Sequence, residues 1–363
     1  MDKKLFRIVL TGGPCAGKTS SLALIYEKFT ALGFNVITVP EIATLFYEAG
    51  IRFNRENLSL LLETYKNLLN YQIFTEETFL NIARSCDKPS IIIYDRGVMD
   101  VSAYLSKEEW KGIIEELSLS AMTLRDTRYD YVFHLVTAAN GAEQFYNHKN
   151  NARKENIEEA RALDIKIMEA WVGHPHLRVI NNSGLHEEKK NKVLTEISSI
   201  VDSPKPIVAK RKFLVSYATE IPLRYESFDI YQTYLKSDKE RELRLRKRGQ
   251  NGLFIYIYSE KSEPINGQSI ETARIIGEPE YTLLLENPDR TRITIHKRRD
   301  CFIWRDLYFE LDTFIDPHCG MAILIIEHLN DTLPVIIPDF IKIGKEITND
   351  SNYYNYALSL AGE

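Results

Sequence analysis

The sequence predicts two domains: a three-layer α/β domain whose parallel sheet carries helices on both faces, followed by a mainly antiparallel β-barrel. Apolar strand-like runs alternate with helical runs up to residue 201. A short segment with two prolines then interrupts the pattern, and beyond it strand-like runs of alternating polarity dominate. We therefore expect domains at residues 1–201 and 207–363, joined by a stiff linker at 202–206.

The first domain is expected to contain five strands and five main helices. Each strand is a short apolar run, and each helix is a longer amphipathic run. Asn156, with Glu159 three residues later, predicts the start of one helix. The expected strands are Leu5–Thr11, Asn35–Val39, Ser90–Asp95, Tyr131–Val136 and Leu177–Ile180. The expected helices are Lys18–Leu32, Asn57–Ala83, Lys107–Leu119, Ile157–Trp171 and Glu187–Val201.

The second domain is expected to be built mostly from strands, because its apolar residues alternate with polar ones. Helical patterns are confined to two short stretches near the end, Ile337–Ile343 and Tyr353–Leu360. The expected strands are Lys212–Tyr217, Leu243–Arg248, Leu253–Tyr258, Tyr281–Glu286, Arg292–Lys297, Leu307–Phe314 and Ala322–Leu329.

Composition narrows the functional classes. The net charge is −5, so bulk charge does not indicate a nucleic-acid or membrane partner, although local basic clusters leave peripheral membrane contact open. No apolar run approaches the ~20 residues of a membrane span. Cys15, Cys86, Cys301 and Cys319 have no paired spacing, which favours a reducing compartment. We expect a cytoplasmic protein.

A complete phosphate-binding loop follows the first predicted strand. Gly12, four further residues, and then Gly17, Lys18 and Thr19 form it. Such a loop turns successive backbone N–H groups towards phosphate oxygens at the positive end of a helix. Lys18 would reach the β- and γ-phosphates, and the Thr19 hydroxyl would ligate Mg²⁺. The predicted nucleotide-binding residues are Gly12, Gly13, Pro14, Cys15, Ala16, Gly17, Lys18, Thr19 and Ser20.

Two carboxylates follow predicted strands of the same sheet. Asp95 ends an apolar strand, where a P-loop fold holds Mg²⁺, and Arg96 beside it is a further catalytic candidate. The alternative for Asp95 is a helix-capping role. Glu41 follows the second strand at the carboxyl edge, where it could accept a proton from a substrate hydroxyl or hold the substrate. The alternative is a solvated loop glutamate.

A polar segment, residues 140–161, follows the fourth strand and carries Lys149, Arg153, Lys154 and Arg161. A segment of this kind suits a lid that closes over phosphates and brings arginine to the transferred group. Arg153 and Arg161 are its catalytic candidates. The alternative is a charged helix face that is only solvated.

The first domain as a whole resembles the small P-loop kinases, including deoxynucleoside and nicotinamide riboside kinases. More narrowly, YDRG at 94–97, YVFHLVTAANGAEQFY at 131–146 and EEARALDIKIMEAWVGHPHLRVINNS at 158–183 resemble the NadR/TRPL-translocation-defect AAA family. The resemblance implies ATP or GTP binding with Mg²⁺, and it places Asn182 near the base. It leaves open whether phosphate is transferred.

Basic residues alternate along several strands of the second domain. Arg244, Arg246 and Arg248 share one face of their strand, where they repel one another unless they are solvated or meet an anion. A solvated outer face is the alternative. The further candidates for an anion-binding face are Lys210, Lys212, Lys297, Arg299 and Lys345.

These residues, with YQTYL at 231–235, FELDTF at 309–314 and GKEITND at 344–350, resemble the CYTH, or triphosphate tunnel, family. The resemblance implies an eight-stranded tunnel in which basic side chains hold a triphosphate and glutamates hold Mg²⁺ or Mn²⁺. Here the opening E-x-E-x-K becomes VAKRK at 208–212, so both glutamates are missing. Glu310, Asp312 and Glu327 remain as metal ligands.

Three functions follow from these patterns. The first is a kinase-like phosphotransferase or NTPase whose second domain binds a nucleotide, polyphosphate or anionic lipid headgroup. The second, implied by the translocation-defect resemblance, is a nucleotide-dependent switch that binds phosphatidic acid or phosphoinositides in membrane-protein trafficking. The third, a triphosphatase, is disfavoured because a tunnel with fewer carboxylates holds divalent cations less tightly.

Overall fold

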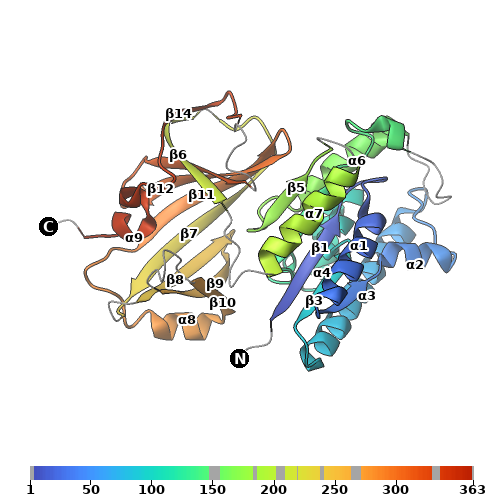
Figure 1. Ribbon diagram of the computed structural model, residues 1–363, viewed down its shortest axis with the longest axis horizontal. Coiled ribbons are helices and arrows are strands. Elements are labelled where there is room, and N and C mark those ends of the chain that lie inside the picture. The colour runs from blue at the N-terminus through green and yellow to red at the C-terminus, as the bar shows by residue number, and fades with distance from the viewer. Residues whose placement is uncertain are drawn as a thin grey trace. The chain divides into compact units, whose positions relative to one another are not determined.

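A computed structural model of the chain describes residues 4–146, 156–182, 186–201, 209–218, 220–237, 241–262, 271–328 and 336–361. The chain divides into two compact units, Met1–Ser198 and Ser199–Glu363. The first is coloured blue to yellow-green in Figure 1, and the second runs on from there to red. Arg153, predicted as a lid arginine, lies outside the described residues.

The first unit is built on a five-stranded sheet with the order β2-β3-β1-β4-β5, and every neighbouring pair is parallel. The predicted parallel sheet is therefore confirmed. Because all strands run the same way, their carboxyl ends meet at one edge, where ligands bind in α/β sheets. The strands are β1 (Leu5–Thr11), β2 (Asn35–Val39), β3 (Ser90–Asp95), β4 (Tyr131–Leu135) and β5 (Leu177–Ile180).

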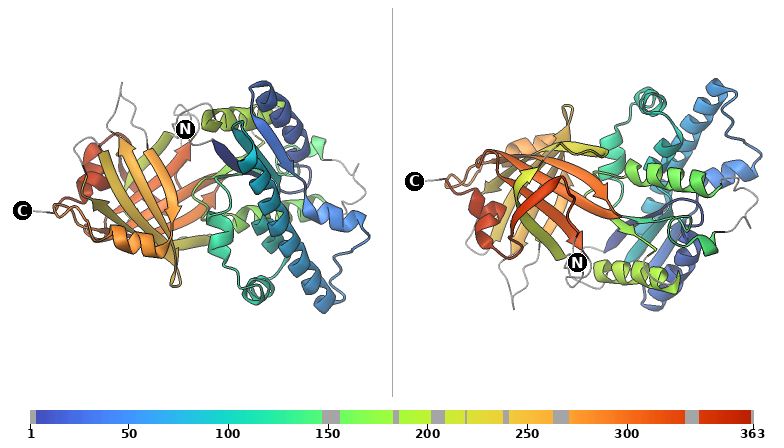
Figure 2. Two further views of the ribbon diagram at one scale, coloured as in Figure 1. Left: turned by 90° about the horizontal axis from the view of Figure 1, so that it is seen from below. Right: turned by 90° about the horizontal axis from the view of Figure 1, so that it is seen from above.

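Helices cover both faces of this sheet, as predicted. α1 and α7 lie on one face and α3 and α6 on the other (Figures 1 and 2). The positions of α1, α3 and α6 follow from right-handed crossovers. α1 connects β1 to β2 in one direction along the sheet, whereas α3 and α6 connect β2 to β3 and β4 to β5 in the opposite direction. The helices are α1 (Lys18–Ala31), α2 (Ile42–Glu48), α3 (Leu58–Ser85), η1 (Val98–Tyr104), α4 (Lys107–Glu116), α5 (Ala121–Asp126), η2 (Glu143–Phe145), α6 (Ile157–Ala170) and α7 (His186–Val201).

Local capping explains where several of these helices begin. The predicted cap of α6 is confirmed: the Asn156 side chain accepts from the Glu159 amide, and the Glu159 carboxylate accepts from the Asn156 amide. α4 begins with the same reciprocal arrangement between Ser106 and Glu109. Each arrangement satisfies backbone donors that the first helical turn leaves without partners.

The second unit is a nine-stranded antiparallel sheet with the order β10-β9-β8-β7-β11-β12-β13-β6-β14. Its two outermost strands, β10 and β14, do not pair with each other within the described residues, so the predicted closed barrel is not confirmed. The strands are β6 (Ala209–Ala218), β7 (Tyr225–Leu235), β8 (Arg241–Gln250), β9 (Leu253–Ser262), β10 (Glu271–Ile276), β11 (Ile295–Trp304), β12 (Leu307–Asp316), β13 (Ala322–His328) and β14 (Ile341–Glu346).

Two predicted elements of the second unit are wrong. The expected strand Tyr281–Glu286 lies largely in helix α8 (Glu278–Leu284), because a proline in the first turn and two acidic residues beside it favour a helix start. The expected helix Ile337–Ile343 instead holds a turn and the start of β14. Pairing with β6 decides the conformation of this segment, since residues from Ile341 to Glu346 lie in that ladder. The expected helix Tyr353–Leu360 is reduced to η3 (Ser351–Tyr353) and α9 (Asn355–Leu358).

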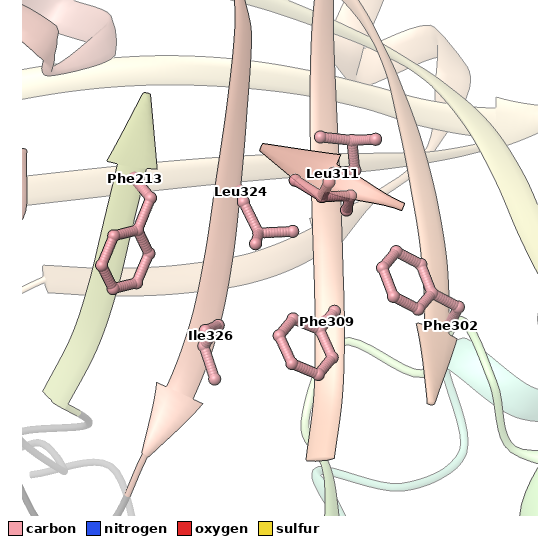
Figure 3. Close-up of a cluster of buried hydrophobic side chains, with 7 residues drawn as sticks. Phe213, Phe302, Phe309, Leu311, Leu324 and Ile326 are labelled. Atoms are coloured by element: carbon pink, nitrogen blue, oxygen red, sulfur yellow. The ribbon is translucent and has the colours of Figure 1, made fainter. Parts of the chain in front are cut away.

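One face of the second sheet is apolar where β6, β11, β12 and β13 pass. Side chains from these strands form the buried cluster shown in Figure 3, whose labelled members are Phe213, Phe302, Phe309, Leu311, Leu324 and Ile326. Side chains alternate between the faces of a strand, so the charged neighbours of these residues point to the opposite face. The core thus fixes the face on which the charged residues gather.

Candidate functional site

The phosphate-binding loop connects β1 with α1 and has the backbone that its glycines permit. Gly12 and Gly17 have φ of 138° and 89°, which other residues rarely adopt. A Cβ atom on Gly12 would lie 2.1 Å from the Leu135 carbonyl oxygen, so a side chain has no room there. Gly17 directly precedes the first residue of α1. The free amides of the first helical turn therefore follow the loop, as an anion site requires.

Lys18 lies over this loop. Its ammonium donates to the carbonyl oxygens of Gly12 and Gly13, at 2.8 and 3.1 Å. Burial, and then the nearby Arg96, lower the pKa of Lys18 to about 8, although Asp95 and Glu41 act in the opposite direction. The structure thus gathers four of the predicted catalytic side chains around the loop.

Asp95 and Thr19 are the predicted Mg²⁺ ligands. Asp95 ends β3, directly opposite Leu10 of β1, and Thr19 is the second residue of α1. The Asp95 Oδ1 atom is buried and accepts no hydrogen bond within the described part of the chain. Burial raises the pKa of this carboxyl group. A buried carboxylate oxygen without a donor fits a hard divalent cation, which prefers oxygen ligands.

Glu41 and Arg96 form an ion pair at the carboxyl edge of the sheet. The Arg96 Nε atom donates to Glu41, and the Thr44 hydroxyl donates to the other oxygen at 2.9 Å. Burial acts to raise the pKa of Glu41, but Arg96 and Lys18 outweigh it and hold the pKa below its usual value. Glu41 is therefore ionised at neutral pH.

A cavity of about 680 Å³ lies beside this pair and is lined by Glu41, Arg96 and Asp100 together with residues of α2, α3 and η1. Aromatic rings form part of its wall: Phe53 lies 5.0 Å from Tyr65 between ring centroids. This cavity was not expected from the sequence, because neither α2 nor η1 was predicted. Clustered aromatic residues after Glu41 were the available signal.

Arg161 and Asn182 bond to the segment after β4, which in turn bonds to the loop through Thr137 and Pro14. Arg161 donates to the Ala139 carbonyl oxygen at 2.6 Å and pairs with Glu143 at 2.7 Å. Asn182 donates to the carbonyl oxygens of Thr137 and Asn140, at 2.7 and 2.6 Å. Both side chains therefore hold the segment that follows β4, and neither contacts Lys18 in this structure.

Asp164 and Asp100, which the sequence analysis missed, support the loop and the end of β3. Asp164 of α6 accepts from the Gly13 amide at 2.6 Å and lies 3.2 Å from His134. Asp100 accepts from the Thr11 hydroxyl at 2.5 Å, and also from the Gly97 amide and the Trp171 indole. Both aspartates are buried. An acidic residue within an otherwise apolar helix face was the signal for Asp164.

In the second unit, three of the predicted cations, Lys210, Lys212 and Arg244, line a cavity of about 810 Å³. Lys261, which was not predicted, lines it as well. Arg244 pairs with Glu271. Within the described residues, Lys212 and Lys261 have no acidic partner within ion-pair distance. Burial and the neighbouring Lys210 lower the pKa of Lys212.

The other predicted cations differ in their surroundings. Burial, with Arg244 and Arg299 nearby, lowers the pKa of Arg246 to about 9, and its best hydrogen bond is a 3.4 Å contact with Gln232. The Arg248 guanidinium lies 3.8 Å from the Phe228 ring centroid. Lys345 pairs with Asp350 at the surface. The positive charge near the cavity is therefore compensated only in part.

The predicted metal ligands of this unit face cations. Glu327 pairs with Lys210, Glu310 with Arg299, and Asp312 with both Lys297 and Arg299. In the ranges that the structure describes, no three histidine, cysteine, aspartate or glutamate side chains lie together as a metal cluster. These carboxylates are thus neutralised by the protein itself.

The fold and the loop define the first unit as a P-loop domain. Residues 7–189, half of the chain, match the AAA domain family, and the chain therefore belongs to that family. An AAA domain of the P-loop type indicates nucleotide binding. No curated protein matches the sequence.

Three solved structures are similar to parts of the chain. Two are of NE1496, described as an inorganic triphosphatase in one and as a hypothetical protein in the other. Both are 29% identical with a TM-score of 0.33, and the aligned region covers 42% of this chain and 93% or 97% of that one. The third is the PH1819 protein of Pyrococcus horikoshii OT3, at 16% identity over 34% of this chain and 80% of that one, with a TM-score of 0.26.

None of the helices in the described ranges combines the length and the apolar character needed to cross a membrane.

Proposed function

We propose that the first unit binds ATP or GTP with Mg²⁺ and transfers the γ-phosphoryl group to a hydroxyl group of a small molecule held in the 680 Å³ cavity. The observation that carries this proposal is the position of the Glu41–Arg96 pair. The pair lies close enough to Lys18 to influence the pKa of that side chain, and both of its members line the cavity. A phosphate donor and a hydroxyl acceptor bound on either side would meet at Glu41.

The residues divide the chemistry between them. The loop amides and Lys18 hold the phosphates, and Thr19 and Asp95 would hold Mg²⁺, which neutralises charge on the phosphate oxygens. The acceptor oxygen attacks the γ-phosphorus while the bond to the β-phosphate oxygen breaks. The acceptor proton passes to ionised Glu41, and Arg96 with Thr44 keeps that carboxylate oriented. Aromatic residues of the cavity wall suit an acceptor with an apolar portion.

Lys18→Ala tests nucleotide binding directly. The buried phosphates would lose a charge-assisted contact, which contributes about 1.5–3 kcal/mol, so we expect ATP and GTP affinity to fall at least tenfold. Calorimetry on the full chain measures this. Lys28→Ala, in the last turn of the same helix, removes an equal charge away from the loop and should leave affinity unchanged. Equal affinities in all three proteins would exclude the loop as the nucleotide site.

We also infer that the second unit binds a phosphate-rich anion in the 810 Å³ cavity. The surplus of positive charge supports this, because Lys212 and Lys261 line the cavity and have no acidic partner among the described residues. Burial, followed by the like charge of Lys210, lowers the pKa of Lys212. Bound anion would relieve that repulsion. An inorganic polyphosphate, a nucleotide and the headgroup of phosphatidic acid or a phosphoinositide share this chemistry. The last would make the protein a nucleotide-dependent switch at membranes.

Lys212→Ala tests the anion site in the Lys18→Ala chain, in which the first unit binds phosphate weakly. We expect tripolyphosphate affinity to fall about tenfold, and the remaining affinity to decline as salt rises, because the attraction is Coulombic. Lys342→Ala removes an equal charge from exposed β14 and serves as the control. Parallel titrations with ATP and with phosphoinositide vesicles distinguish the ligand sources. Equal tripolyphosphate affinity in both lysine variants would contradict the assignment.

A further inference from the structure

Three carboxylates of the second unit lie on one face of the sheet. Glu310 and Asp312 are alternate residues of β12, and Glu327 comes from the adjacent β13. Their side chains are only 6%, 1% and 6% exposed. Buried carboxylates are costly unless each meets a positive charge. A divalent cation is one way to supply that charge, and it is the way that the triphosphate tunnel resemblance implies.

In this chain, side chains of the neighbouring strands supply the charge instead. Lys297 and Arg299 of β11 hold Asp312, with contacts of 2.6 Å from Lys297 and of 2.6 and 2.8 Å from Arg299. Arg299 also reaches Glu310 at 2.6 Å. These two cations therefore account for the β12 side of the cluster.

Lys210 completes the arrangement from β6. It stands directly opposite Glu327 in the β6–β13 ladder, and its ammonium lies 2.5 Å from that carboxylate. Although burial acts to lower it, the pKa of Lys210 is raised by Glu327 and, next, by Glu310. The ammonium therefore interacts electrostatically with a carboxylate of β12 and with one of β13. Its side chain also lines the 810 Å³ cavity.

These residues do not fit a divalent cation as they stand. Such an ion needs several oxygen ligands that are not already paired, and its charge would repel Lys210 and Arg299. Lys212, two residues along β6, has no acidic partner among the described residues and remains available to an anion. The same face therefore combines a neutralised acidic part with a cationic part.

We infer that the Lys210 ammonium takes the place of a divalent cation beside Glu327 and Glu310, so that the second unit holds phosphate-rich anions without a metal. This inference rests on the anion-binding function proposed above for the second unit. In this arrangement Lys210 neutralises buried carboxylates, and Lys212 with its cationic neighbours contacts the anion directly.

Binding of Mn²⁺ to the full chain tests the inference, measured by the electron paramagnetic resonance signal of the free ion. All proteins carry Lys18→Ala, so the first unit is identical in each and differences report on the second unit. We expect Lys210→Glu to tighten Mn²⁺ binding at least about tenfold, because it removes the resident cation and adds an oxygen ligand. Lys210→Gln, which only removes the cation, should show a smaller gain and guards against misfolding of the glutamate variant.

Lys342→Glu is the matched control. It makes the same change at an exposed lysine of β14, which pairs with β6 far from Lys210, so it should bring no comparable gain in Mn²⁺ binding. Tripolyphosphate titrations in the presence of a chelator complete the test, and the Lys210-containing protein should bind without metal. Binding that requires Mn²⁺, or equal Mn²⁺ affinity in Lys210→Glu and Lys342→Glu, would overturn the inference. Absence of tripolyphosphate binding under every condition would instead reject the anion-binding function.

Discussion

Glu41→Gln is expected to lower the rate of phosphoryl transfer by about 10²–10⁴ while nucleotide affinity changes little. Glutamine keeps the shape of the side chain and an oxygen to which Thr44 can donate. It cannot take up the proton of the acceptor hydroxyl. The low pKa set by Arg96 and Lys18 means that Glu41 acts once the acceptor hydroxyl is already losing its proton in the transition state. Transfer from γ-labelled ATP or GTP to pooled hydroxyl-bearing small molecules provides the measurement.

Glu48→Gln is the matched control for this experiment, since Glu48 is an exposed glutamate at the far end of α2, the short helix that Glu41 precedes. It should transfer label at the wild-type rate. A nucleotide-dependent switch would behave differently: the wild-type and Glu41→Gln chains would hydrolyse nucleotide equally slowly, and no labelled acceptor would appear. That outcome would reject phosphoryl transfer while leaving nucleotide binding intact.

The sequence predicted the first unit well because its signals are local. Each strand is a short apolar run, and the glycines of the loop at 12–17 are needed for backbone angles that few other residues adopt. Asn156 and Glu159 predict the start of α6, because these two residue types form a reciprocal cap. In all of these, the determining atoms lie within a few residues of one another.

Other features depend on contacts between distant segments, and the sequence could not show them. Asp164 bonds to Gly13, 151 residues away, and the cavity beside Glu41 forms only when α2, α3 and η1 come together. In the second unit, Lys210 and Glu327 could each be recognised as charged, but their pairing depends on the register of β6 against β13. Tyr281 illustrates the opposite failure, since its apolar neighbours resembled a strand whereas helix-start residues decided the outcome.

Glu76→Ala is expected to destabilise the first unit by about 3 kcal/mol, because removing one member of a buried ion pair leaves the other uncompensated. Glu76 lies in the middle of α3 and is 2% exposed. It accepts from Arg128 at 3.0 Å and from the Tyr129 hydroxyl at 2.8 Å. That hydroxyl in turn accepts from the Val98 amide, just after the segment that holds Asp95 and Arg96. The variant should therefore also loosen the catalytic edge of the sheet.

Glu77→Ala is the control, because Glu77 is the next residue and also pairs with Arg128, at 3.3 Å, but it is 60% exposed. An exposed pair of this kind contributes about 1 kcal/mol or less, so the two neighbouring alanine substitutions should differ several-fold in their cost. Urea unfolding measures the free energy of unfolding of both variants, and hydrogen exchange in peptides of α3 and β3 locates the change. Both are carried out at about pH 8, because burial raises the pKa of Glu76 to about 6 and the carboxylate is ionised above it. If both substitutions cost equally little, the buried network around Glu76 does not hold α3 against the catalytic edge.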